Sequence, residues 1–385
     1  MLYKTFHVFL LFIFSVFLMV FVGLSSGFFD PNRIKILIKT DLDVIYHTLA
    51  HLDLLNYSSN LFSQSYVDEI RQAKNDLRVG VTLLDKERDM LEVDYRKYSS
   101  LRFLYKAPFI ADDFSSFKQA LKLIDYNFRT GSPRLLGKEK ERKRPLMFGN
   151  SQRLIPIFQK HFSSKQEREF VKNFAACLDE EFVSFYQFYR EARIELDQNG
   201  IELFLEFWKI KGLKILWPWA SCSGAKKFTI FLSPAMNKNG LSVPVLEGGN
   251  LSFFVVTPLP KTVPEAIHSF FVVLQQTTQR STDDLVILES LSSRSDQTAS
   301  LKKIRENASI YAGHLYLKMC FPEYHQSYLR FFLEKVTNKK IDFNVLEDIL
   351  IKTYALNKAS LRQIENFVNQ LVHNSDINNQ CLKNS

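Results

Sequence analysis

NLSFFVVTPLPKTVPEAIHSF, residues 250–270, joins two patterns that determine how this chain folds. Its first eight residues are rich in aromatic and β-branched side chains, which predicts a β-strand at Asn250–Thr257. After the prolines that end this run, Thr262 is followed three residues later by Glu265, the pattern of a capped helix N-terminus. The stretch therefore predicts a strand followed at once by a helix.

The rest of the chain surrounds this unit with a second strand and many helices. KKFTIFL at Lys226–Leu232 is another β-rich run, and shorter strand patterns occur at Arg33–Lys39 and Gly212–Trp217. Apolar residues at helical spacing predict helices at Asp41–Asn56, Tyr66–Tyr98, Phe114–Phe128, Gln152–His161, Gln166–Glu195, Pro264–Gln275, Leu301–Cys320, Tyr324–Val336 and Leu346–Val372. We expect an α+β fold that is mainly helical, with a small, mostly antiparallel sheet.

The amino terminus carries the features of a targeting segment. Lys4 precedes an apolar run from Phe6 to Leu24, and small residues follow up to Gly27. A secretory signal has this order, so residues 1–27 are predicted to be a signal peptide of an exported, periplasmic or extracellular protein. The run is also about 18 residues long, the lower limit for a bilayer span, so an uncleaved transmembrane anchor is the alternative.

Length, charge and cysteine spacing limit the possible domain organisation and partners of the remaining chain. We expect a helical region at 28–137, a charged loop at 138–145 and an α+β domain at 146–385. The net charge of +9 is small for 385 residues, and bases are scattered among acids, so no nucleic-acid partner is predicted. The four cysteines form no C-x-x-C pair, and their disulfide pairing stays open.

Two short motifs have plain structural interpretations. Gly23–Gly27 matches G-x-S-x-G, but a nucleophile elbow needs a strand before it, and here the targeting run precedes it. His47 and His51 stand four residues apart, which places two imidazoles on one helical face at metal-binding spacing. Thr48 stands where a catalytic glutamate would, and no third ligand lies nearby, so these histidines are interpreted as helix packing.

The helix of the opening stretch carries a partial metallopeptidase motif. In H-E-x-x-H, two histidines bind zinc on one helical face while the glutamate activates the metal-bound water. Glu265 and His268 occupy the second and last positions, but Pro264 occupies the first and has no lone pair for a metal. The competing interpretation is a capping box in which Glu265 reaches back to the helix N-terminus.

The order of elements resembles a family of largely uncharacterised bacterial zincin-like proteins with an H-E-F-S-H-S-F helix. Similar segments are Ile230–Pro234, ending in Leu-Ser-Pro, Glu265–Phe270, and the start of a helix at Glu306-Asn307. The aromatic segment Phe185–Tyr189 is similar to a segment upstream of the family's sheet. The resemblance implies a zincin-like carboxyl-terminal part in which Glu306 matches the third, glutamate ligand of a gluzincin.

The absence of the first motif histidine, whose position is occupied by Pro264, decides the functional prediction. Only His268 and Glu306 remain as vestigial metal ligands, and His314 and His325 are interpreted as ordinary core or surface residues. We therefore expect an inactive metallopeptidase homologue, without a cofactor, that binds an extended peptide or protein. The alternatives are an active zinc metallohydrolase with Glu265 as general base and a recruited ligand, and an unrelated helical envelope protein.

Overall fold

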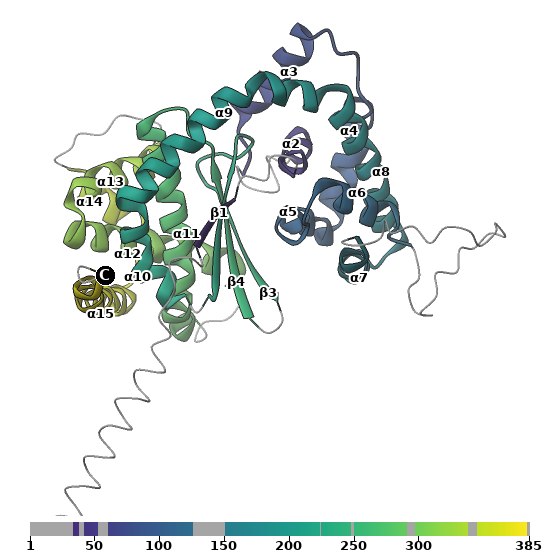
Figure 1. The fold of residues 1–385 in the computed structure, drawn as a ribbon. Helices are drawn as coiled ribbons and strands as arrows, with labels where there is room; N and C mark the ends of the chain where they lie inside the picture. Colours follow the sequence, from purple (N-terminus) through teal and green to yellow (C-terminus); the bar gives the residue numbers. More distant parts are fainter. Residues whose placement is uncertain are drawn as a thin grey trace, which may run out of the picture.

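The protein has an α+β fold that is mainly helical, as the sequence predicts (Figure 1). The computed structural model describes residues 34–37, 42–52, 61–125, 151–223, 225–247, 250–290, 297–337 and 345–382. The described strands form one four-stranded sheet in the order β1-β2-β4-β3. Their bounds are β1 Ile34–Leu37, β2 Lys227–Ser233, β3 Leu241–Glu247 and β4 Asn250–Pro258.

The prediction of a mostly antiparallel sheet is wrong. β2 pairs in parallel with both β1 and β4, and only β3 runs antiparallel to its neighbour β4. The parallel pairs arise because long connections separate these strands: the described residues between β1 and β2 are mostly helical, and the edge strand β3 lies between β2 and β4 in sequence. The sequence missed β3 because it contains Pro244, which strands tolerate mainly at sheet edges.

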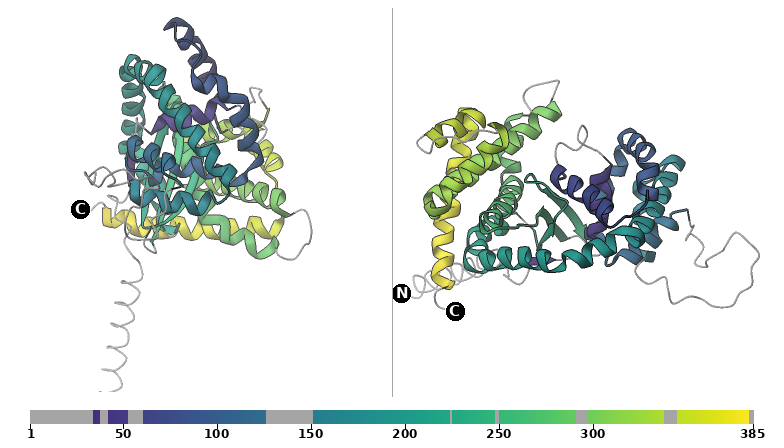
Figure 2. Two further views of the ribbon diagram at one scale, coloured as in Figure 1. Left: turned by 90° about the vertical axis from the view of Figure 1, so that its right-hand side faces the viewer. Right: turned by 90° about the horizontal axis from the view of Figure 1, so that it is seen from above.

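The sheet separates two hydrophobic cores, because successive side chains of a strand point to opposite faces. In β4, Phe254 and Val256 join the core of the amino-terminal helices, whereas Phe253 and Val255 join the core of the carboxyl-terminal helices. Figure 2 shows these two helical layers on either side of the sheet, with α9 (Gln187–Phe207) running along both. The two layers together position the strand ends on which the candidate site is built.

The amino-terminal layer consists of α2 Asp43–His51, α3 Gln64–Asp76, α4 Leu83–Lys97, α5 Ala107–Ile110, α6 Phe114–Lys122, α7 Ser151–His161 and α8 Lys165–Glu181. The long helix predicted at Tyr66–Tyr98 is two helices. Arg78 has a left-handed φ of 53° and ends α3, and Thr82 begins α4 with a capping box to Asp85. Helices from both sides of the predicted boundary at 138–145 share one core.

Residues 165–222 form a continuous helical path that bends at two π-helical turns, Phe182–Tyr186 and Trp208–Gly212. The strand predicted at Gly212–Trp217 is therefore wrong, since Leu213–Cys222 is helix α10. Its buried residues Ile215, Leu216, Trp219 and Ala220 recur at helical spacing, which outweighs the β-propensity of the short apolar run.

The carboxyl-terminal layer contains α11 Val263–Ser290, α12 Gln297–Cys320, α13 Pro322–Thr337, α14 Leu346–Thr353 and α15 Lys358–Leu382. Strand β4 and helix α11 follow one another as the opening stretch predicts. The first two helices form an antiparallel hairpin: Thr278 Oγ1 donates to the Ser309 carbonyl over 3.2 Å. Thr278 lies 12 residues before Ser290, and Ser309 lies 12 residues after Gln297, so positions equally far from the connecting turn face each other.

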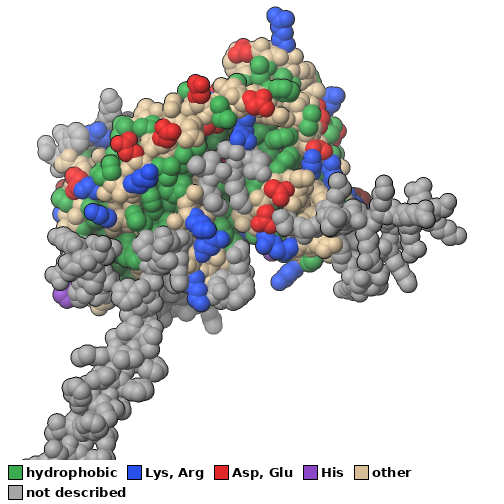
Figure 3. Space-filling view, in the orientation of Figure 1, with side chains coloured by type: hydrophobic (Ala, Val, Ile, Leu, Met, Phe, Trp, Pro, Cys, Tyr) green, Lys and Arg blue, Asp and Glu red, His purple; other side chains and the backbone are tan. Residues whose placement is uncertain are grey.

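The predicted transmembrane segment requires a correction. None of the helices in the described ranges is long and apolar enough to cross a membrane. The longest of them, α11, is interrupted by polar residues such as those at 275–279. The predicted targeting run Phe6–Leu24 and the charged loop 138–145 lie outside the described residues. On the face seen in Figure 3, basic and acidic side chains are interspersed.

Candidate functional site

A cleft of about 1010 Å³ opens where β2 and β4 end. Because these strands are parallel, their carboxyl ends lie at the same edge of the sheet, the position where open α/β sheets bind ligands. The cleft is bounded by α3, α9, the turns after β2 and β4, the start of α11, and α13. Its walls therefore come from both helical layers.

The predicted residues Glu265 and His268 both line this cleft. Glu265 also caps α11: its Oε2 accepts the Lys261 amide at 2.7 Å, and its own amide lies 3.4 Å from Thr262 Oγ1. The predicted capping box is thus present in a shifted form, with Lys261 rather than Thr262 as the amide donor. Pro264 stands in the first turn, where a missing N–H costs no helical hydrogen bond.

The ring of His268 packs against Phe331, with the centroids 5.1 Å apart. The predicted partner Glu306 is exposed and lies farther along the α11–α12 hairpin. In the hairpin register Glu306 faces the region of Ser281, which is about 13 residues, or about 20 Å, along α11 from His268. The register therefore argues against His268 and Glu306 as ligands of one metal ion.

Charged side chains cross the cleft in a network centred on Glu69. Its carboxylate forms ion pairs with Arg193 and, over 3.5 Å, with Lys261, and it accepts the Tyr189 hydroxyl at 2.9 Å. Arg193 also faces Asp197, whose pKa is raised by burial against the opposing effect of that guanidinium. These pairs connect α3, α9 and the turn before α11 across the cleft, and the Glu69–Lys261 pair is largely exposed and therefore weak.

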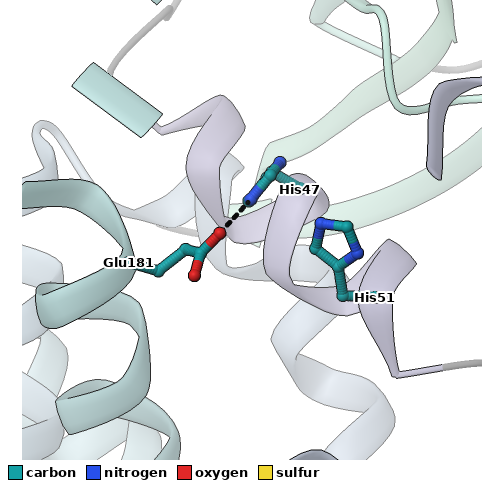
Figure 4. Close-up of side chains that lie close together, drawn as sticks. All are labelled: His47, His51 and Glu181. Carbon is teal, nitrogen blue, oxygen red and sulfur yellow. Dashed lines mark hydrogen bonds and ion pairs between the residues drawn. The ribbon is translucent and has the colours of Figure 1, made fainter. Parts of the chain in front are cut away.

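Behind the cleft wall lies a buried cluster of three potential metal ligands, His47, His51 and Glu181. His47 and His51 are one turn apart on α2, and Glu181 ends α8 (Figure 4). One ligand atom from each lies within 4.8 Å of the others. Among the described residues this is the one group of three such side chains within that distance.

Hydrogen bonds fix the orientation of His47. Its Nε2 lies 3.1 Å from Glu181 Oε1, and its Nδ1 lies 3.0 Å from the hydroxyl of Tyr66, which also lines the cleft. His51 packs edge-on against His47 with the ring centroids 4.6 Å apart, and its Nε2 is buried without a hydrogen-bond partner. Sequence analysis missed this site because Glu181 is 130 residues beyond His51, and only the fold brings them together.

Lys74 supplies the positive charge of this cluster. Its ammonium donates to Glu181 Oε2 at 3.0 Å, to Asp85 Oδ2 at 2.9 Å and to Thr82 Oγ1 at 3.1 Å. Burial would raise the pKa of Glu181, but His47 and Lys74 outweigh it and hold that pKa at about 2. Glu181 is therefore an ionised carboxylate with a side chain that is 0% exposed.

Burial has the opposite effect on the two histidines. It lowers the pKa of His47, against the raising effect of Glu181, and it lowers the pKa of His51 well below 6.5 with help from the neighbouring His47. Both rings are consequently neutral near pH 7 and keep a lone pair. A charged carboxylate and two neutral imidazoles form the ligand set that zinc and related ions prefer.

The other pair of histidines considered as substitute ligands forms a separate cluster. His314 Nδ1 lies 2.8 Å from His325 Nε2, and His314 Nε2 lies 3.5 Å from Glu347 Oε1. Glu347 also accepts the Lys318 ammonium at 2.6 Å. These residues belong to α12, α13 and α14, outside the cleft.

Comparisons with known proteins returned no match, whether against family models, curated proteins or solved structures. The resemblance to zincin-like proteins therefore stays a prediction from the residues. No disulfide joins Cys177, Cys222 and Cys320 in the described part of the chain.

Proposed function

We propose that this protein binds an extended peptide segment in the cleft at the carboxyl ends of β2 and β4, as an exported, zincin-like protein without peptidase activity. The size of the cleft supports a ligand of several residues. Its volume of about 1010 Å³ lies at the upper end of the usual range for ligand sites. A site built from both helical layers can also hold a ligand along its length.

The chemistry of the lining carries the proposal. Amide side chains have one donor group and one acceptor group, which match the N–H and C=O groups of a peptide main chain. Four such side chains line the cleft: Gln64, Asn199, Asn237 and Asn239. Asn237 already donates to the Phe62 carbonyl and accepts the Asn239 amide, and Gln64 donates to Asp68, so a peptide would exchange these bonds or use the second lone pair of each carbonyl oxygen, whereas Asn199 is exposed. Apolar side chains also line the cleft: Phe62 and Leu259 are partly exposed and can contact peptide side chains, whereas Met236, Val272 and Phe331 are buried and form its floor. Acids and bases are both present, so the lining selects a polar ligand of mixed character.

The motif residues favour binding over catalysis. Glu265 already accepts the Lys261 amide, and Pro264 offers no ligand atom where the first histidine of a zincin stands. Because the hairpin register places Glu306 about 20 Å along α11 from His268, only His268 remains of the predicted ligands, and a zinc site needs at least three. The export component rests on the apolar run Phe6–Leu24 and is tested by finding the mature protein outside the cytoplasm with residues 1–27 removed.

Calorimetric titration with a positional-scanning library of capped octapeptides tests peptide binding. Asn199 is an exposed residue of the cleft, so the bulky side chain of Asn199→Trp should occupy space that the peptide needs. We expect the Kd of the selected peptide to rise at least about tenfold, which corresponds to about 1.4 kcal/mol. Gln198→Trp is the matched control, because Gln198 is exposed on the same helix but does not line the cleft.

Two results would contradict the proposal. Equal loss of affinity in both tryptophan variants would mean that the peptide binds outside the cleft. If no octapeptide of the library binds, the proposal that the ligand is a peptide is wrong. Zinc-dependent cleavage of the selected peptide, lost in Glu265→Gln, would instead establish the active metallohydrolase alternative.

A further inference from the structure

The buried cluster on α2 and α8 has the composition and spacing of a metal site that is separate from the cleft. We propose that His47, His51 and Glu181 bind one divalent transition-metal ion of the zinc class. Zinc bound at about 2.0–2.2 Å in tetrahedral geometry holds its ligand atoms about 3.4 Å apart. The His47–Glu181 pair is already at 3.1 Å, and all three ligand atoms lie within 4.8 Å, so side-chain shifts of about 1.5 Å complete the site.

The unpartnered Nε2 of His51 points independently to a ligand. His51 is 9% exposed, and this atom is buried without a hydrogen bond. A buried polar atom left unpaired costs about 1–3 kcal/mol, so native proteins usually satisfy such atoms. A metal ion between the three side chains gives this nitrogen the partner that it lacks in the metal-free state.

Tyr66 allows His47 to change its role without gaining or losing a proton. In the metal-free arrangement the Nε2–H of His47 donates to Glu181, and Nδ1 accepts from the Tyr66 hydroxyl. With a metal on Nε2, the ring carries its proton on Nδ1 and donates it to the same hydroxyl oxygen. A hydroxyl both donates and accepts, so Tyr66 serves as the outer partner that orients a metal-bound imidazole.

Lys74 is the internal competitor of the metal ion. Its ammonium now balances the charge of Glu181, but it also contacts Asp85 through both carboxylate oxygens, at 3.1 and 2.9 Å. When a metal ion binds Glu181, the Lys74 ammonium still donates to Asp85 and Thr82, so its buried charge keeps an ionised partner. The exchange replaces one cation partner of Glu181 by another.

The burial of the ligands determines what kind of metal site this is. The side chains of His47 and Glu181 are 0% exposed, and α2 is buried around its whole circumference. A substrate cannot reach such an ion, and Thr48 stands where a zincin has its catalytic glutamate. The ion therefore has a structural role: it joins α2 to α8 within the amino-terminal core.

Zinc titration of the metal-free full chain, with a chelator of known affinity as competitor, tests the site. We expect one equivalent to bind, with an affinity that His51→Gln lowers at least about 100-fold, because an inner ligand matters more than an outer one. Lys74→Met should raise the affinity at least about tenfold by removing a nearby positive charge. His373→Gln, at an exposed position of α15, is the control and should leave the affinity unchanged.

The opposite response of the Lys74 variant separates the proposal from simple loss of folding. An affinity that His51→Gln leaves unchanged, or that Lys74→Met lowers in a protein with native circular dichroism, would overturn the proposal. Anomalous diffraction from zinc-soaked crystals of the unmodified chain locates the ion directly. A peak between α2 and α8 is expected, and a peak elsewhere or none would also overturn it.

Discussion

His314 should make the folding stability of this protein depend on pH between about 7 and 4. Its side chain is 1% exposed and lies beside His325 and Glu347. Burial, followed by the charge of His325, lowers its pKa from 6.5 to about 4, against the raising effect of Glu347. The folded protein therefore binds this proton much less readily than the unfolded chain.

The sign and size of the effect follow from proton linkage. Below about pH 6.5 the unfolded chain takes up the proton, whereas the folded state takes it up only near pH 4, so stability falls as pH decreases through this interval. A shift of about 2.5 pKa units corresponds to about 3 kcal/mol at 1.36 kcal/mol per unit. That loss is a substantial fraction of the roughly 5–15 kcal/mol that stabilises a typical domain.

Urea denaturation at half-unit intervals from pH 7.5 to 4 measures this contribution. His314→Gln removes the titrating ring, so the loss of unfolding free energy across the interval should be about 3 kcal/mol smaller than in the unmodified protein. His47 and His51 on α2 contribute equally to both proteins and cancel in the difference, whereas His325 contacts His314 directly, so a His325→Gln variant and the double variant are measured alongside to separate the contribution of the pair. His373→Gln serves as the exposed control. Parallel stability curves for the unmodified protein and His314→Gln would refute the reasoning.

Two further predictions concern stability at neutral pH. Glu181→Gln breaks a buried ion pair, so in the urea assay it should lower the unfolding free energy by about 3–5 kcal/mol at pH 7. The control Glu195→Gln, at an exposed position, should change it by less than about 0.5 kcal/mol. Similar values for the two variants would contradict the prediction. Gly200→Ala should lower the unfolding free energy by about 1–3 kcal/mol, because the new Cβ would lie 2.3 Å from the Pro260 carbonyl oxygen. A calorimetric melting temperature equal to that of the unmodified protein would refute this steric conflict.

Local patterns predicted the elements of this fold better than their pairing. Strong β-propensity and turn residues located β2 and β4, and the capping pattern at Thr262 located the start of α11. Pairing depends on the path of the connections, which propensity does not encode, so the parallel arrangement of β2 and β4 was missed. Propensity also failed at Gly212–Trp217, where packing against the carboxyl-terminal core selects a helix.

The same distinction applies to the sites. A motif confined to one helix, such as Glu265 and His268, is visible in sequence, and both residues do reach a cleft. Their predicted partner Glu306 required knowledge of the hairpin register, which the length of α11 determines. His47 and His51 show the converse error, since their spacing was visible but Glu181 was not, and a search limited to neighbouring residues left the pair without a third ligand.

Burial decides how these two sites divide their roles. The cleft is open and lined by amides and ion pairs, so it can exchange ligands, whereas the cluster of His47, His51 and Glu181 is buried and has room for an ion but not for a peptide. Tyr66 belongs to both, because it lines the cleft and its hydroxyl contacts His47 Nδ1. A metal ion that fixes the His47 tautomer would also fix the direction of this hydroxyl hydrogen bond, and would thereby order the wall of the cleft in which we propose that a peptide binds.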